Sequence, residues 1–284
     1  MPPAGRQLPD LVTSATIRAT PRYEREFAVY IRTLKAVIAA LGALAAIAVT
    51  CEPVLAERLT VGAPPSLRPA LTDILPMFER EHDVAVHVVY TPSKTLMREI
   101  ENGAPVDVFL SAGLDEVEHL YKKGLTLNGK PRVYAQTSLV LVMSSDSLAS
   151  LISFPEALQT PTIHIALGDP QTSSLGVITA KALTKLTAYK TLPNIHYAPH
   201  SEDIIHLVRT GKADVGLVYR VDTINSGQVR ISDDSPLGTY LPIQFGQAVV
   251  STCRPALRSA AEEFSNFLMT PRIQKLLIKY GFDS

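Results

Sequence analysis

From Leu59 onward, short apolar runs alternate with longer segments in which apolar residues recur every three or four positions. The short runs fit strands buried on both faces, and the longer segments fit helices that bury one face. Strands are predicted at residues 59–61, 84–90, 107–112, 139–143, 163–166, 195–198, 215–219 and 247–251. Helices are predicted after Ser66 and at residues 94–103, 114–123, 151–158, 177–186, 202–211, 255–269 and 271–280. This alternation predicts an α/β fold with mostly parallel sheets.

Two further features refine that expectation. Pro69 falls in the first turn of the helix after Ser66, where its missing N–H costs little, whereas Pro76 is expected to kink or shorten that helix. The part of the chain after Ala56 is too long for one doubly wound sheet, because domains usually hold about 100–150 residues. We therefore predict two similar lobes.

The N-terminal segment differs in composition from the rest of the chain. Arg32 and Lys35 precede an unbroken apolar run at residues 36–49, and the sequence VLAE then offers small residues at a cleavage site. This pattern predicts a signal peptide within residues 1–56, cleaved after Ala56, and an exported mature protein. A retained N-terminal anchor is one alternative, and a lipoprotein acylated at Cys51 is another, although the preceding AVT makes a poor lipobox.

Charge and cysteine content exclude several classes of protein. The chain carries 27 basic and 27 acidic residues, so no electrostatic footprint for nucleic acid is visible. Cleavage after Ala56 would remove Cys51 and leave Cys253 alone, without an internal disulfide.

One local pattern recurs along the chain: a strand, a short loop with a small or hydroxyl residue, and then a helix. It occurs at Ser66, at Ser93, in the loop 169–176 and before Ile204. In doubly wound sheets, ligands bind outside the carboxyl ends of the strands, where helix N-termini present unpaired N–H groups. The pattern is typical of an anion site, and helix capping by the serines is the structural alternative.

Other candidate chemistries have weaker support. Neither Ser66 nor Ser93 lies in a G-x-S-x-G turn, and spacing assigns no histidine or aspartate to either serine. His196, His200 and His206 are close in sequence and could suggest metal, but no H-E-x-x-H motif accompanies them, and surface or loop positions are the alternative. Two further residues have structural readings, Asp169 as a turn residue before Pro170 and Tyr219 as a strand aromatic.

Taken together, the stretches PPSLRPAL, TLMREIENGAPVDVFLSA, TSLVLVM, GDPQTSSLGVITAKALTKL, GKADVGLVY and YGF make the chain similar to the periplasmic molybdate-binding proteins of ABC importers. The resemblance covers residues 59 to about 282. It implies a periplasmic binding protein of type II, in which two Rossmann-like lobes with mixed, mostly parallel sheets close around molybdate or tungstate. It further implies a monomer that is not an enzyme, carries no cofactor and delivers its ligand to an inner-membrane permease.

The resemblance also assigns site residues by position. Ser66 and Ser93 correspond to the two serines that donate to the anion, and Tyr219 corresponds to a tyrosine whose hydroxyl completes the cage. Leu175 and Ile204 fall where the family uses backbone amides.

The same resemblance divides the chain between the lobes. Lobe 1 is expected at residues 57–136 plus 243–284 and lobe 2 at 137–242, with hinges near residues 132–137 and 237–245.

At several positions the chain departs from the family pattern. Pro64 and Pro65 replace small residues ahead of Ser66 and would stiffen that loop. Lys94, beside Ser93, could point to solvent or raise anion affinity, as could Arg68. Ser173 and Ser174 could shift selectivity.

Three alternatives to molybdate import stay open at this point. The first is a protein of the same fold that binds another oxyanion or a small organic anion. The second is a secreted serine hydrolase, and the third is a sensor that hands the anion to a membrane receptor.

Overall fold

The computed structural model describes residues 29, 32–35, 58–127, 129–185, 194–224, 226–234 and 242–283. The chain divides into two compact units, Met1–Leu55 and Ala56–Ser284, and everything that follows concerns the second. The cleavage site after Ala56, Cys51 and nearly all of the predicted signal segment lie outside the described residues. Among the helices that are described, none combines the length and the apolar character needed to cross a bilayer.

The first sheet contains the strands that begin the folded unit and one strand from its C-terminal part. In spatial order its five strands are β2 (Val86–Tyr90), β1 (Leu59–Ala63), β3 (Val108–Leu110), β10 (Ile243–Val249) and β4 (Arg132–Thr137). β1 pairs in parallel with β2 and β3, whereas β10 runs antiparallel to β3 and β4. β10 therefore inserts at the interior of a sheet whose other strands come from the N-terminal half.

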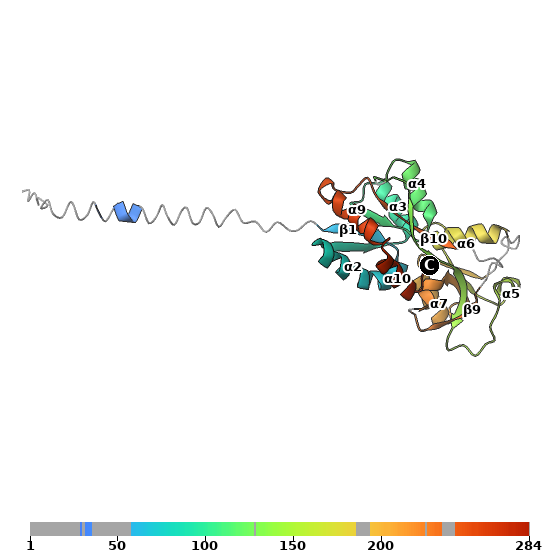
Figure 1. Cartoon of the computed structure of the whole chain (residues 1–284). Helices are drawn as coiled ribbons and strands as arrows, with labels where there is room; N and C mark the ends of the chain where they lie inside the picture. Colours follow the sequence, from blue (N-terminus) through green and yellow to red (C-terminus); the bar gives the residue numbers. More distant parts are fainter. Residues whose placement is uncertain are drawn as a thin grey trace, which may run out of the picture. The chain divides into compact units, whose positions relative to one another are not determined.

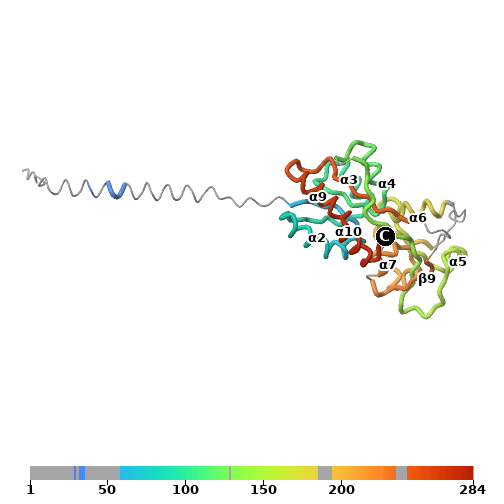
Figure 2. The backbone as a smooth tube through the Cα atoms, in the orientation of Figure 1, coloured from blue at the N-terminus to red at the C-terminus, as the bar shows by residue number. Residues whose placement is uncertain are grey.

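Helices cover both faces of this sheet. One face carries α3 (Ser93–Glu101) and α4 (Leu114–Lys122), which pack in a small core with Phe109 of β3. The other carries 3-10 helix η1 (Pro65–Leu67), α2 (Arg68–His82), 3-10 helix η3 (Pro255–Leu257), α9 (Arg258–Phe267) and α10 (Pro271–Lys279). Figures 1 and 2 show that α10, near the C-terminus, lies beside α2, the α-helix that follows the first strand.

The second sheet is built from the middle of the chain. In spatial order its strands are β7 (Ile195–Ala198), β6 (Ile165–Gly168), β8 (Val215–Tyr219), β5 (Leu139–Ser144) and β9 (Val229–Asp233). β6, β7 and β8 are parallel, and β5 is antiparallel to β8 and β9. Its helices are α5 (Phe154–Gln159), α6 (Ser174–Lys185), α7 (Ser201–Arg209) and α8 (Arg220–Ile224).

The two sheets confirm the predicted α/β class with mixed, mostly parallel sheets. Apolar periodicity explains the helices: α7, for example, buries Ile204, Ile205 and Val208 against β5, β6 and β8. Pro76 lies inside α2, which continues to His82. Of the two expected effects, a kink or a shorter helix, the second is therefore wrong. β4, α8 and β9 were not predicted from the sequence.

The chain crosses from the first sheet to the second at Ser138, between β4 and β5. Arg220, directly after β8, braces this crossing: its amide donates to the Ser138 carbonyl at 2.8 Å and its Nε to the Ser138 hydroxyl at 3.0 Å. The return crossing falls between β9 and β10, where residues 235–241 are outside the described part.

Candidate functional site

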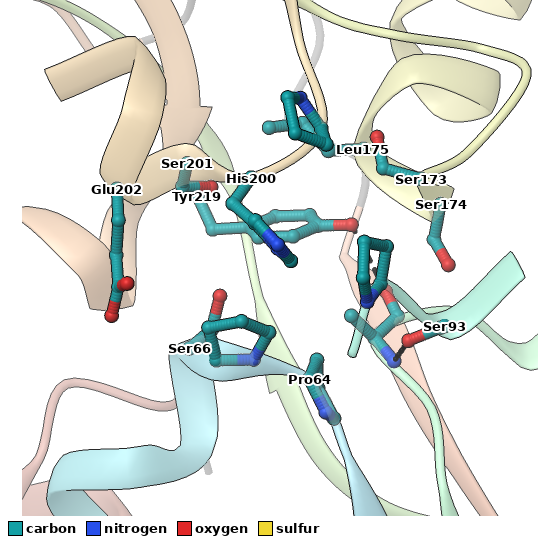
Figure 3. A pocket seen from close by; sticks show the side chains of 14 residues that line it. Pro64, Ser66, Ser93, Ser173, Ser174, Leu175, His200, Ser201, Glu202 and Tyr219 are labelled. Carbon is teal, nitrogen blue, oxygen red and sulfur yellow. Dashed lines mark hydrogen bonds between the residues drawn. The ribbon is translucent and has the colours of Figure 1, made fainter. Parts of the chain in front are cut away.

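A pocket lies between the two sheets, at the carboxyl ends of their parallel strands. About 330 Å³ of space lies between its walls, part of it open to solvent. The lining residues are Pro64, Pro65, Ser66, Pro92, Ser93, Ala112, Ser173, Ser174, Leu175, Pro199, His200, Ser201, Glu202 and Tyr219. In Figure 3, Pro64, Ser66 and Ser93 form one side, Leu175 and Ser201 lie opposite, and the Tyr219 ring reaches between them.

Helix N-termini surround this pocket. α3 begins at Ser93, α6 at Ser174 and α7 at Ser201, and each follows a parallel strand through a short loop. The first N–H groups of a helix have no partner within it, and the helix dipole favours negative charge at this end. The arrangement therefore presents amide donors from both sheets to one space.

Ser93 is buried, and its hydroxyl oxygen accepts the Ala112 amide at 2.9 Å. This bond fixes the side chain and leaves its one hydroxyl hydrogen available to a ligand. Capping does not explain the residue, because the N-cap position of α3 is occupied by Pro92.

Ser66 is held in a different way. Its hydroxyl donates to the Asp222 carboxylate at 3.1 Å, and Pro64 rather than Ser66 is the N-cap of η1. The capping alternative is therefore wrong for both serines. Burial raises the pKa of Asp222 to about 6, although the hydroxyl bonds from Ser66 and Ser201 act in the opposite direction.

Tyr219 ends β8 and reaches across to the first sheet. Its hydroxyl donates to the Ala112 carbonyl at 3.1 Å, and its ring meets Phe245 of β10 edge-on with centroids 5.4 Å apart. Burial raises the pKa of Tyr219 well above its ordinary value, and the carboxylates of Glu116 and Asp222 add to this effect. The side chain therefore keeps its proton and remains a donor.

The loop between β6 and α6 depends on two glycines. A Cβ on Gly176 would lie 2.3 Å from the carbonyl carbon of Asp169, and one on Gly168 would lie 2.6 Å from the Gly176 amide nitrogen. Because no side chain fits between these backbones, the helix start approaches the strand end closely, which places Leu175 at the pocket. Asp169 organises the turn, since its carboxylate accepts the Gln171 amide at 2.8 Å.

The structure brings four of the five predicted site residues to the pocket: Ser66, Ser93, Leu175 and Tyr219. Ile204 is not among the lining residues. Its side chain is fully buried against Gly216, and its amide donates to the His200 carbonyl at 3.2 Å. Ser201 and Glu202, in the first turn of the same helix, line the pocket instead.

Ser201, Glu202 and Asp222 were not predicted as site residues from the sequence. For Ser201 a signal existed, because a serine directly before a helix and after a strand is the same pattern that identified Ser66. Nothing in the sequence linked Asp222 to the site.

Three of the positions that depart from the family pattern form contacts around the pocket. The Lys94 ammonium, in α3 beside the first sheet, donates at 2.6 Å to the Pro170 carbonyl, in the turn after β6 of the second sheet. The Ser174 hydroxyl donates to the buried Glu116 carboxylate at 2.8 Å, again across the two halves, whereas that of Ser173 donates to the Asp169 carbonyl within its own loop.

The three histidines that are close in sequence lie in different surroundings. Within the described residues, no three of the His, Cys, Asp and Glu side chains are grouped as metal ligands would be. His200 lines the pocket, His196 lies beside the His164 ring, and His206 is within hydrogen-bond distance of Arg209.

The pocket's donors are neutral. None of its lining residues, all of which are described, is Lys or Arg. Hydroxyls and amides can hold an oxyanion through charge-assisted hydrogen bonds. A nucleophile role for Ser66 gains no support, because its hydroxyl donates to a carboxylate rather than to an imidazole.

Comparisons with known proteins agree with this arrangement. The family model described as bacterial extracellular solute-binding protein matches residues 59–283. The molybdate-binding protein ModA of Escherichia coli (strain K12) is 29% identical over 230 residues, covering 79% of this chain and 88% of that protein. The ModA of Mycobacterium tuberculosis (strain ATCC 25618 / H37Rv) is 29% identical over 234 residues, 80% of this chain and 85% of that protein.

Solved structures show the same fold. The Azotobacter vinelandii periplasmic molybdate-binding protein superposes with a TM-score of 0.68 at 24% identity, covering 80% of this chain and 99% of that one. The sulfate-binding protein SubI from Mycobacterium tuberculosis H37Rv gives a TM-score of 0.67 at 19% identity, over 79% of this chain and 86% of that one.

Proposed function

Because the chain belongs to the bacterial extracellular solute-binding proteins, we propose that it captures molybdate or tungstate between its two sheets and delivers the anion to an ABC permease. The observation that carries this proposal is the convergence of Ser66, Ser93, Leu175 and Tyr219 on one pocket without Lys or Arg. Neutral donors from both halves suit a dianion that must be held tightly and later released. Molybdate-binding relatives support the choice of anion.

The two halves supply different donors to the anion. From the first sheet come the hydroxyls of Ser66 and Ser93. From the second come the amides at the starts of α6 and α7 and the Tyr219 hydroxyl, whose hydrogen turns from the Ala112 carbonyl to the anion. We propose that the amides of Ser201 and Glu202 take the place that family position assigned to Ile204. An anion that bridges both halves favours the closed arrangement.

The protein's export and the motion of its lobes are the remaining parts of the proposal. Export by the signal segment would place residues 57–284 in the periplasm, where a monomer would meet the permease. The lobe boundaries 57–136 plus 243–284 and 137–242 remain a proposal, as do hinges near residues 132–137 and 237–245. Ligand-free and ligand-bound structures that differ by rotation at other segments would contradict those hinges.

Titration calorimetry with molybdate, tungstate, sulfate and phosphate tests the function. We expect heat and tight binding with molybdate and tungstate at micromolar concentrations, and little with the two other anions. Binding of sulfate or phosphate with no response to molybdate would instead assign the pocket to another oxyanion, as the shared fold of the sulfate-binding protein allows.

Replacing either serine should weaken the anion complex. In Ser66→Ala and Ser93→Ala, each variant loses one hydrogen bond to a charged ligand, so we expect about 1.5–3 kcal/mol of lost binding energy, roughly 10- to 100-fold in Kd. Calorimetry measures the affinity, and thermal unfolding measures the stability.

Ser153→Ala is the matched control. Ser153 caps α5 by accepting the Glu156 amide at 3.4 Å and is not a pocket residue. Its replacement should cost about 1 kcal/mol of stability and leave anion affinity unchanged. If Ser66→Ala and Ser93→Ala behave like this control, the two serines are structural.

A further inference from the structure

The carboxylate of Asp222 connects the two walls of the pocket. Ser66, which follows β1 of the first sheet, donates to its Oδ2 at 3.1 Å. Ser201, at the start of α7 on the second sheet, also donates to this carboxylate through its hydroxyl. Asp222 lies behind the pocket lining, so it acts on a ligand through these serines.

The hydrogen bond from Ser66 conflicts with its role as an anion donor. A serine hydroxyl has one hydrogen and can direct it to one strong acceptor at a time. In the described arrangement this hydrogen points to Asp222. An ionised Asp222 therefore competes with the anion for the same donor.

Charge acts in the same direction as donor competition. A carboxylate that is separated from a bound dianion by a single side chain repels it. This repulsion is strong where little water screens the two charges. Burial already raises the pKa of Asp222 to about 6, and the negative charge of Glu202 adds to the effect. A dianion in the pocket would raise this pKa further.

We propose that oxyanion binding is coupled to the uptake of one proton by Asp222, which frees the Ser66 hydroxyl to donate to the anion. The proton comes from solvent and forms the O–H bond of the carboxylic acid, and no other covalent bond changes. The acid donates to the Ser66 oxygen, and the Ser66 hydrogen turns toward the ligand. This inference rests on the proposed function, because it requires an oxyanion beside Ser66.

Other titratable groups surround Asp222 and set the controls. From α7 it is Glu202 and, at the N-cap of that helix, His200, both of which line the pocket. From β8 it is Tyr219, which stays protonated. His200 is the one imidazole among the lining residues, so its replacement is the control for proton uptake.

The remaining charged groups near α8 are engaged with partners that lie away from the pocket. Arg220 donates to Ser138 and to the Asp234 carbonyl. On β9, Asp233 accepts the Phe154 amide, and Arg230 donates to carbonyls of residues 147 and 149.

The sign of the pH effect follows from proton uptake. If binding takes up a proton, a lower pH favours the complex, so affinity should fall as the pH rises above about 6. One proton per anion corresponds to a roughly tenfold weaker affinity for each pH unit. Molybdate at micromolar concentration between pH 6.5 and 8.5 is the suitable probe.

The test is calorimetry of wild-type protein with molybdate at pH 7.5 in three buffers of different ionisation enthalpy. The slope of the observed heat against that enthalpy gives the protons taken up. We expect an uptake approaching one proton per anion, together with the fall in affinity from pH 6.5 to 8.5. A slope of zero with tight binding overturns the coupling and leaves the proposed function standing.

Variants identify the group that takes up the proton. Asp222→Asn should abolish both the uptake and the pH dependence, and should bind molybdate more tightly than wild type at pH 8.5. His200→Gln should retain the proton uptake, whatever its effect on affinity. If the proton uptake is lost in His200→Gln, the proton belongs to the imidazole and the role of Asp222 is overturned. If no oxyanion binds to wild type at any pH, both the function and the coupling are wrong.

Discussion

Replacing Gly176 with alanine is expected to lower the free energy of unfolding by about 3 kcal/mol and to weaken molybdate binding at least 100-fold. The added Cβ would lie 2.3 Å from the carbonyl carbon and 2.4 Å from the carbonyl oxygen of Asp169. Both atoms belong to the backbone, so a rotamer change cannot relieve the contact, and the overpacked loop must move. That movement displaces the amides at the start of α6, including that of Leu175. Urea unfolding and calorimetry measure the two effects.

Gly211→Asn is the control for this experiment. Gly211 follows α7 with a φ of +70°, nothing lies within 4 Å of a Cβ built there, and asparagine tolerates this conformation better than most residues. We expect nearly wild-type stability and affinity. A Gly176→Ala protein that binds molybdate as tightly as Gly211→Asn would show that the approach of α6 to β6 does not set the anion site.

The second large effect is expected at Asp107, which lies at the opposite end of the first sheet from the pocket. Its side chain is 1% exposed and accepts the Thr60 amide at 2.7 Å and the Arg254 guanidinium at 2.7 Å. Asp107→Asn removes the charge from this buried pair and places an amide group among donors. We expect the free energy of unfolding to fall by about 3 kcal/mol at neutral pH, as measured by urea unfolding.

The same pair predicts an acid dependence. Burial by itself would raise the pKa of Asp107, but the bonds from Arg254 and from the Thr60 amide outweigh it and lower the pKa below 3.8. The stabilisation is therefore complete above the ordinary pKa of aspartate and is lost as the pH falls through the lowered one. The difference between wild type and Asp107→Asn should be constant from pH 5 to 7 and shrink below about pH 4.

Asp115→Asn serves as the matched control for this substitution. Asp115 pairs with Lys181, and both side chains are 63% exposed, so its loss should change stability by less than about 1 kcal/mol. Equal effects of the two substitutions would mean that the buried pair contributes no more than a surface pair.

Apolar periodicity predicted most of the fold, including the edge strands β2 and β7, but it missed the other two edge strands. β4 (RVYAQT) and β9 (VRISD) are both terminal strands in their sheets. An edge strand pairs on one side only, and its polar residues resemble those of a loop. The interior strands β1, β3, β5 and β8 are continuous apolar runs, which is why the sequence reveals them.

The site was predictable where it depends on local order along the chain. Ser66, Ser93 and Tyr219 stand at strand ends, a position that the sequence shows. Ile204 does not line the pocket, whereas Ser201, three residues earlier in the same helix, does. Asp222 contacts Ser66 across 156 residues of sequence, and no local pattern encodes such a pairing.

The position of β10 in the first sheet has a consequence for how the protein forms during synthesis. β10 lies between β3 and β4, so β4 has no neighbour in that sheet until residues 243–249 exist. The second sheet, in contrast, consists only of strands between residues 139 and 233. Because a chain is synthesised from its N-terminus, the second sheet has all its strands before the first sheet does. The first sheet begins earlier in the sequence but is completed last. Long-range pairing of this kind is slow, so completion of the first sheet is expected to be a late step in folding.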